Sequence, residues 1–256
     1  MENKKIILLA ADGNSTRIIF HHLSEKFIIH TVILEHKENK KTFIKRRIKK
    51  LGWWKVAGQI AFRVFIVKWL NITSAKRTRK IIEQYHLNIN PIPVDKLLTV
   101  DSINDDWVAS LMKEIQPDAV IVNGTRIISK KILTAINCPF INTHTGITPM
   151  YRGVHGGYWA LVNDDKNNCG VTIHLVNDGI DTGNILYQKK IIPAIKDNFV
   201  TYPLLQTAAA LELLTRAIKD ALEGQLQSQV AAGPSALWYH PTIGQYIYNR
   251  IFRKVK

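Results

Sequence analysis

A run of apolar residues at 118–124, "DAVIVNG", limits the fold more than any other feature of the chain. The run is nearly continuous and does not alternate, which is typical of a parallel strand covered by helices on both faces. Other segments read as strands and helices in turn, with strands expected at 6–11, 27–34, 138–144 and 170–176 and helices at 129–136, 158–165 and 202–224. This alternation predicts an α/β fold: a Rossmann-like, mostly parallel sheet with helices on both faces.

The later part of the chain adds an antiparallel edge and a long helix. Val171, Ile173 and Leu175 alternate with polar residues, and the segment 184–194 is expected to pair with them as an antiparallel strand. In the helix 202–224, one apolar stripe is predicted, made of Leu204, Ala208, Leu211, Leu214, Ile218 and Leu222. We expect residues 1–256 to form a single domain.

The N-terminus and the two cysteines indicate a cytoplasmic protein. The apolar run after "MENKK" is only six residues long and Asp12 follows it, so we read it as the first strand and not as a targeting segment. Cys138 and Cys169 have no neighbours at metal-ligand spacing, which favours two reduced thiols and no metal site.

The net charge of +15 is concentrated in one segment. Residues 37–80 contain fifteen Lys and Arg residues and one acid, Glu38, so the rest of the chain is nearly neutral. We interpret residues 37–86 as a basic amphipathic helical insertion. Three roles are open: a helix buried against the main domain, a helix on an anionic membrane surface, and nucleic-acid binding, which no recognised motif supports.

The membrane interpretation makes a specific prediction about side chains. Four polar residues between 53 and 70 argue against a spanning helix. A helix lying on the membrane would instead insert Trp53, Trp54, Phe62 and Trp69 into the headgroup layer.

Two stretches contain the candidate catalytic residues: "FINTHTGITPMYRG" at 140–153 and "GVTIHLVNDGIDTGNILYQ" at 170–188. Asn142, His144 and Asp181 offer an amide, an imidazole and a carboxylate. Such a set suits acyl transfer to an amine, with two donors for the oxyanion and a carboxylate that favours the imidazolium. On spacing alone, a purely structural histidine is the commoner outcome.

Together the two stretches resemble the 10-formyltetrahydrofolate-dependent formyltransferases, well over residues 97–190 and loosely over 4–24. That family includes glycinamide ribonucleotide, methionyl-tRNA and sugar N-formyltransferases. The resemblance implies that Asn142, His144 and Asp181 are catalytic and that 10-formyltetrahydrofolate is the co-substrate. It implies pterin binding, largely by backbone, at two loops: Arg126, Ile127 and Ile128, and Asn177, Asp178, Gly179 and Ile180.

The resemblance also suggests where the acceptor binds. Tyr151, Arg152 and Gly153 end the first motif. The loop "GNSTR" stands where the purine enzyme has a glycine-rich phosphate loop, and it consists of Gly13, Asn14, Ser15, Thr16 and Arg17. A helix N-terminus is a reasonable anion site, although a tight strand-to-helix turn explains the same residues.

The acceptor itself is expected to be a nucleotide-linked amino sugar for surface polysaccharide of the O-antigen type. The stretch "HGGYWAL" after Gly153 resembles the sugar enzymes, and the chain is shorter than a tRNA enzyme with its C-terminal domain. The alternatives are phosphoribosylglycinamide formyltransferase, a formyltetrahydrofolate hydrolase, which would carry an additional N-terminal domain, and a non-catalytic membrane adaptor. The oligomeric state is left open.

Overall fold

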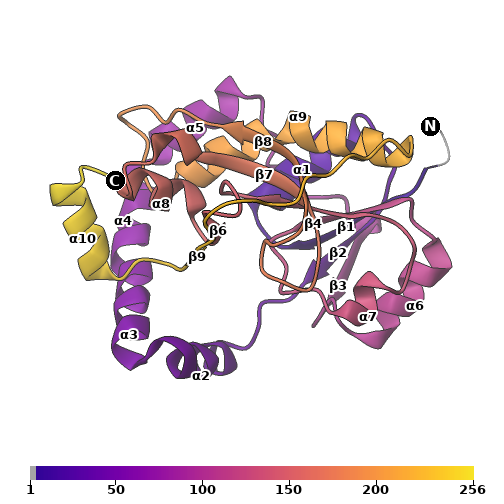
Figure 1. Cartoon of the computed structure of the whole chain (residues 1–256), viewed down its shortest axis with the longest axis horizontal. Helices are drawn as coiled ribbons and strands as arrows, with labels where there is room; N and C mark the ends of the chain where they lie inside the picture. Colours follow the sequence, from indigo (N-terminus) through magenta and orange to yellow (C-terminus); the bar gives the residue numbers. More distant parts are fainter. Residues whose placement is uncertain (1–3) are drawn as a thin grey trace.

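A computed structural model describes residues 4–256, and its main sheet has seven strands in the order β3-β2-β1-β4-β5-β7-β8 (Figure 1). The first five strands are parallel, and β7 and β8 are antiparallel to their neighbours. Their bounds are β1 (Ile6–Ala11), β2 (Ile29–Glu35), β3 (Leu97–Val100), β4 (Ala119–Asn123), β5 (Phe140–His144), β7 (Gly170–Leu175) and β8 (Ile185–Lys190). The predicted Rossmann-like sheet with an antiparallel extension is confirmed.

Helices cover both faces of the sheet (Figure 1). Ile6 and Leu8 of β1 pack in the same core as α1 (Asn14–Ser24) and α9 (Tyr202–Leu222), while Ile7 and Leu9 pack with α6 (Asp106–Ile115) and α7 (Lys130–Leu133). Successive residues of β1 therefore both lose contact with water, and this is why its sequence is apolar without alternation.

The stripe of α9 differs slightly from the prediction. Leu211, Leu214 and Ile218 are buried, as expected. Leu205 and Ala210 are also buried, whereas the predicted Leu204 and Ala208 are only partly covered. The first half of the helix therefore faces the core through Leu205 and Ala210, and the predicted Leu222 at its end is also only partly covered.

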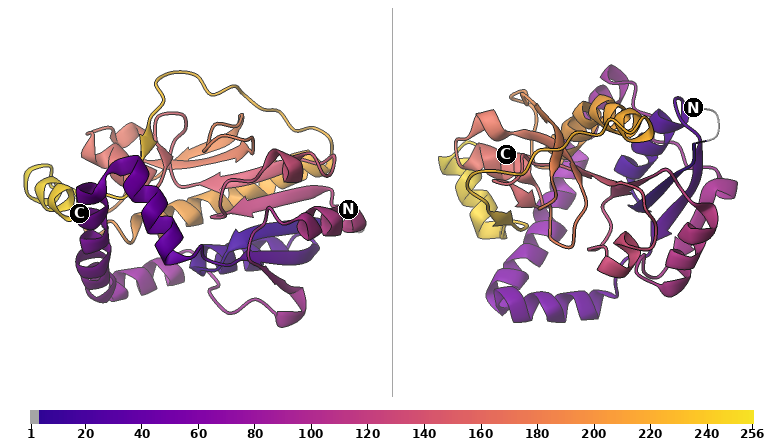
Figure 2. Two further views of the ribbon diagram at one scale, coloured as in Figure 1. Left: turned by 90° about the horizontal axis from the view of Figure 1, so that it is seen from below. Right: turned by 45° about the vertical axis from the view of Figure 1, so that its right-hand side comes forward.

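The basic segment forms a chain of helices between β2 and β3. It consists of α2 (Lys40–Leu51), α3 (Trp53–Ala61), the π-helical turn η1 (Phe62–Val67), α4 (Lys68–Thr73) and α5 (Ala75–Gln84). The elements α3, η1 and α4 follow one another as a column at one edge of the molecule, and α10 (Ile243–Phe252) lies on the outer side of this column (Figures 1 and 2).

The aromatic residues of the column are divided between core and surface. Phe62 is fully buried, with its ring 4.8 Å from that of Phe199 and 5.1 Å from that of Tyr246. Trp53, Trp54 and Trp69 are exposed. The expectation that Phe62 would enter a headgroup layer is therefore wrong, because this side chain instead joins the column to the domain.

The short turn η2 (Val94–Lys96) leads directly into β3. The remaining short elements are β6 (Arg152–Gly153), α8 (Gly156–Val162), η3 (Lys166–Asn168) and β9 (Leu237–Trp238). β6 and β9 pair in parallel, and the Trp238 indole donates a hydrogen bond to the Met150 carbonyl at 3.0 Å. This pairing brings the segment that precedes α10 beside the carboxyl ends of β4 and β5.

Candidate active site

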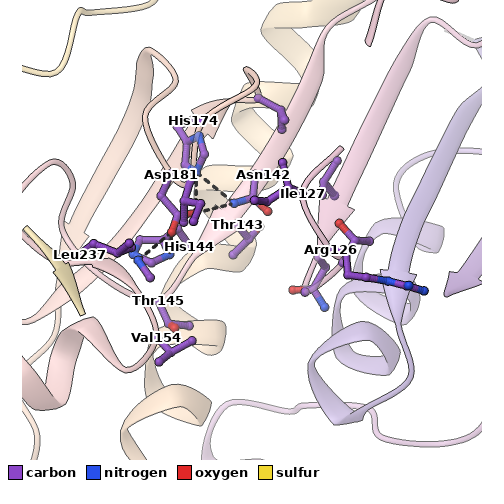
Figure 3. Close-up of a pocket in the computed structure, with 18 of the residues that line it drawn as sticks. Arg126, Ile127, Asn142, Thr143, His144, Thr145, Val154, His174, Asp181 and Leu237 are labelled. Carbon is purple, nitrogen blue, oxygen red and sulfur yellow. Dashed lines mark hydrogen bonds and ion pairs between the residues drawn. The ribbon is translucent and has the colours of Figure 1, made fainter. Parts of the chain in front are cut away.

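The pairing of β5 with β7 places three polar side chains together. Asn142 lies opposite His174, and His144 lies opposite Thr172. Asn142 and His144 point to the same face because they are two residues apart on one strand. Asp181 reaches them from the loop after β7, with Oδ2 3.3 Å from His144 Nδ1 and Oδ1 3.5 Å from Asn142 Nδ2 (Figure 3). The three residues predicted to be catalytic are thus in contact.

His144 is held by partners on both sides of its ring. The Nε2 atom lies 2.7 Å from the Tyr151 carbonyl, and Nδ1 faces Asp181. Gly146 permits this arrangement, since a Cβ at that position would lie 2.6 Å from His144 Nε2 and 2.3 Å from the Tyr151 oxygen. Both ring nitrogens therefore face acceptors, a geometry that suits the doubly protonated imidazolium.

Burial and charge act in opposite directions on this pair. Burial lowers the pKa of His144 below its ordinary 6.5, while Asp181 and the Tyr151 carbonyl act to raise it. Burial alone would raise the pKa of Asp181. The charge of His144, the neighbouring His174 ring and the hydrogen bond from the Gly153 N–H together outweigh burial and lower that pKa. Asp181 is consequently a carboxylate at neutral pH, and it supports the charged form of His144.

His174 is a member of the site that sequence reasoning missed. Its Nδ1 lies 2.7 Å from the Leu175 carbonyl and donates to it, so Nε2 is left as an acceptor, 3.0 Å from Asn142 Nδ2. This contact fixes the amide nitrogen of Asn142 towards Asp181 and the pocket. The alternation of 170–176 placed His174 on the polar face, but the sequence did not show that this strand pairs with β5.

The first loop predicted to bind pterin is organised by one buried acid, Glu35, at the end of β2. Its carboxylate accepts hydrogen bonds from the backbone N–H groups of Ile103 at 3.1 Å and Arg126 at 2.8 Å. It also pairs with the Arg126 guanidinium at 2.9 Å. Asn104 continues the scaffold: it donates to the Ile127 carbonyl at 3.0 Å and accepts from the Ser129 N–H at 2.7 Å.

These contacts decide which parts of the loop face the pocket. The guanidinium of Arg126 bonds to the carbonyls of His36 and Asp101, away from the catalytic residues. Ile127 is half exposed and lines the pocket (Figure 3). Ile128 is buried and also belongs to the lining. The arrangement suits recognition of a ligand by backbone groups.

The second predicted loop is stabilised by Asn177. Its side-chain oxygen accepts from the Gly179 N–H at 3.1 Å and from the Thr182 hydroxyl at 2.7 Å. Asn177, Gly179 and Ile180 line the pocket, whereas Asp178 is exposed and lies outside the lining. Gly183 lets the loop approach β7, because a Cβ there would lie 1.6 Å from the Leu175 carbonyl.

The motif Tyr151-Arg152-Gly153 positions the site and does not simply face an acceptor. The Tyr151 side chain is buried and its hydroxyl donates to Asp165 at 2.9 Å. Arg152 donates to the Ile180 carbonyl at 3.0 Å, and the Gly153 N–H donates to Asp181 at 2.8 Å. Tyr151 and Arg152 support His144 and the second loop and do not line the pocket, whereas Gly153 does; the predicted contact of this motif with the acceptor stays a prediction.

Of the loop Gly13 to Arg17, only Ser15 lines the pocket. Its hydroxyl accepts from the Asn123 amide at 3.0 Å. Thr16 is buried and donates to the Ala11 carbonyl at 2.6 Å, and Arg17 lies 3.5 Å from Asp12. Gly13 and Asn14 begin α1 outside the lining. Thr16 and Arg17 line a second, smaller pocket beside Asp12, and the predicted role of this loop in acceptor binding stays a prediction.

The pocket has a volume of about 560 Å³, and the three residues predicted to be catalytic lie between its two ends. Arg126 and Ile127 are on one side of them, and Val154 and Leu237 on the other (Figure 3). Beyond Leu237 the wall is completed by Trp238, Tyr239 and Arg47. Arg47 belongs to α2, so the basic insertion contributes a cation to the pocket.

Arg47 is fixed where it meets the pocket. Its Nη2 donates to Gln59 at 2.9 Å, and its guanidinium lies 5.6 Å from the centre of the Tyr239 ring. Within residues 4–256, no group of three or more His, Cys, Asp or Glu side chains could hold a metal ion. The titratable side chains that line the pocket are His144, His155, His174, Asp181, Arg47, Arg126 and Tyr239.

Comparisons with known proteins agree with this geometry. The family model described as "Formyl transferase" matches residues 68–206. The chain is 30% identical over 160 residues to methionyl-tRNA formyltransferase of Thermodesulfovibrio yellowstonii, a match covering 60% of this chain and 51% of that protein. The chain spans about half or less of the length of the curated relatives it matches.

Three solved structures show the same fold at low identity. A sugar N-formyltransferase from Shewanella has 15% identity and a TM-score of 0.57, over 92% of this chain and 76% of that one. Glycinamide ribonucleotide transformylase 1 from Symbiobacterium toebii has 16% identity and a TM-score of 0.57, over 91% and 96%. A formyltransferase from Anoxybacillus kamchatkensis, in complex with UDP-4,6-dideoxy-4-formamido-L-AltNAc and tetrahydrofolate, has 18% identity and a TM-score of 0.51, over 91% and 85%.

Proposed function

The chain belongs to the formyl transferase family, whose model matches more than half of its residues, and on that premise we propose that it transfers a formyl group from 10-formyltetrahydrofolate to the primary amine of a nucleotide-linked amino sugar. The observation that carries the proposal is the contact of Asn142, His144 and Asp181 inside one pocket. Two of these side chains can donate hydrogen bonds to a developing oxyanion, and the third is a carboxylate.

The formyl donor is proposed to bind across the two organised loops. A pterin presents hydrogen-bond donors and acceptors along the edge of a flat ring, which backbone N–H and C=O groups can match. The loop held by Glu35 offers such groups at Arg126 to Ile128, and the loop held by Asn177 offers them up to Ile180. Tetrahydrofolate is present in the related Anoxybacillus enzyme, which supports this class of co-substrate.

Formyl transfer would use the hydrogen-bond donors and the carboxylate of this site. The neutral amine attacks the formyl carbon, and the formyl oxygen becomes negatively charged. Asn142 Nδ2 donates to that oxygen. His144 Nδ1, which lies 3.3 Å from Asp181, must carry a proton to act as the second donor; burial lowers the pKa of His144, and the charge of Asp181 acts against that lowering. Asp181 also removes the proton that the amine loses, directly or through water. When the tetrahedral centre collapses, the bond to N10 breaks and N10 takes up a proton, so that the products are a formamide and tetrahydrofolate.

The far wall of the pocket favours an acceptor that carries phosphate and an aromatic ring. Arg47 supplies a fixed guanidinium, which suits a diphosphate. Trp238 and Tyr239 line the same wall and offer apolar ring surface to a base. A nucleotide-linked sugar has both groups, and its formylated product would enter surface polysaccharide synthesis.

The experiment is an acceptor panel with purified protein and 10-formyltetrahydrofolate. The panel contains several nucleotide-linked amino sugars, glycinamide ribonucleotide and buffer alone, and products are identified by mass spectrometry. We expect a formamido product from at least one amino sugar. Turnover of glycinamide ribonucleotide alone would assign the purine reaction, and formate without any amide would assign hydrolysis. Either result would contradict the proposed acceptor while leaving the formyl donor in place.

A further inference from the structure

The column α3–η1–α4 and the neighbouring helix α10 expose an unusually apolar surface, which we name the outer helical face. From the column it includes Trp53, Trp54, Phe65, Trp69 and Ile72, of which Trp54 is 79% and Ile72 72% exposed. From α10 it includes Ile247, Ile251 and Phe252, the last 67% exposed. Monomeric soluble proteins rarely leave so many large apolar side chains in water on adjoining elements.

The column is attached to the domain along its other side. Val56, Phe62 and Leu70 are buried, and the Gln59 amide donates to the His240 carbonyl at 2.7 Å. Residues Trp53–Thr73 are long and apolar enough to cross a membrane by length and composition alone, and most of this stretch is exposed. Because one side is bonded to the domain, the helix can offer its exposed side chains to a surface but cannot leave the domain to span a bilayer.

Basic helices stand at both ends of the column. At one end, α2 has the sequence "KKTFIKRRIKKL" and no buried residue; at the other end lies α5, "AKRTRKIIEQ" (Figure 1). Lysines and arginines four apart on α2, such as Lys41 and Lys45, repel each other and destabilise the helix. Glu38, which pairs with Arg46 at 2.8 Å, is the one acid within 37–80. Anionic groups from outside the chain would therefore reduce the repulsion between the basic side chains of α2.

We propose that the outer helical face and α2 bind together to the surface of an anionic lipid bilayer, with the column lying parallel to the membrane. Exposed tryptophans suit the headgroup layer, and lysines suit anionic lipid. A second copy of this chain is a poorer occupant, since a symmetric contact would bring two segments of like charge together. A nucleic acid would bind the basic side chains but would leave the apolar side chains exposed to water, so it matches the surface less well than a lipid bilayer does.

The test is co-sedimentation of the intact protein with vesicles of phosphatidylcholine alone or with phosphatidylglycerol, at low and high salt. We expect binding to the anionic vesicles only, and release by salt. Each lysine at such a surface contributes roughly fivefold to affinity. The variant with Lys41→Glu, Lys45→Glu and Lys49→Glu should therefore bind on the order of a hundredfold more weakly. The double variant Trp54→Ser with Phe65→Ser should also lose binding.

A matched control carries the same change of charge elsewhere, with Lys113→Glu, Lys130→Glu and Lys189→Glu, all exposed positions outside 37–80. It should bind vesicles like the native chain, and formyl transfer to a soluble acceptor should be unaffected in all three variants. No sedimentation with anionic vesicles at low salt would overturn the proposal. An equal loss of vesicle binding in the control variant would also overturn it. So would a dimer, detected by light scattering, that dissociates in the variant with Trp54→Ser and Phe65→Ser. If the variant with both apolar substitutions still bound vesicles, binding would be purely electrostatic, and this would contradict the proposed insertion of apolar side chains.

Discussion

At the scale of single residues, Asn142 and His144 are the two donors expected to stabilise the transition state. Loss of one such donor typically costs about two to three decades of turnover in acyl-transfer enzymes. We therefore expect Asn142→Ala and His144→Ala each to lower kcat by about a hundredfold or more, while the thermal unfolding curve stays close to that of the native chain. Steady-state kinetics would reject the assignment if either variant kept near-normal turnover.

Asp181 is expected to act through His144 as well as on the amine. Its Oδ2 is shared between the imidazole and the Gly153 N–H, and its charge supports the imidazolium. Asp181→Asn should be about as damaging as His144→Ala, and the double variant should be little worse than either one. A double variant whose loss is the product of the two single losses would show that the residues work independently.

At the scale of elements, Glu35 shows how one side chain shapes a binding loop. Glu35→Gln removes the charge that holds Arg126 and leaves one oxygen for the N–H groups of Ile103 and Arg126. We expect the KM for 10-formyltetrahydrofolate to rise about tenfold with a small change in kcat, and stability to fall by about 1–3 kcal/mol.

Glu38→Gln is the matched control for Glu35→Gln, because Glu38 pairs with Arg46 near the protein surface. That variant should leave the donor KM unchanged. An unchanged donor KM in Glu35→Gln itself would mean that the loop does not bind the folate.

The elements also show what sequence reasoning could and could not reach. The contact of Asn142, His144 and Asp181 was predictable because the two stretches that contain them, taken together, resemble a known family. His174, Glu35 and Arg47 were not, because each acts across a contact between distant segments: β5 with β7, β2 with the 124–129 loop, and α2 with the segment before α10. Tyr151 was placed near the site correctly, but its buried hydroxyl and bonded carbonyl could not be foreseen from its type.

At the scale of the whole molecule, the join between the column and the domain contains two partly buried histidines. The rings of His155 and His240 lie 4.9 Å apart, with Arg63 near both. Burial, with the neighbouring cations Arg47 and Arg63, lowers the pKa of His240 to about 4, and burial also lowers that of His155 well below 6.5. The unfolded chain therefore binds more protons than the folded one below about pH 6.5.

Stability should consequently fall as the pH drops from 7 towards 4, by up to about 1.4 kcal/mol per pH unit for each such histidine. Urea unfolding at about pH 7.5 and pH 5 would measure the slope. His240→Phe removes one titrating group, so this variant should lose less stability on acidification than the native chain. An identical loss in both proteins would show that His240 does not contribute.

The most direct measurement of the central claim follows the formyl carbon itself. The protein is mixed with 10-formyltetrahydrofolate labelled with ¹³C in the formyl group and with the amino sugar selected from the panel, and the label is followed by NMR. The account predicts that the label moves into the formamide of the sugar with the native chain and stays on the donor with His144→Ala. Label that appears as formate, or that reaches the sugar equally well without His144, would contradict it.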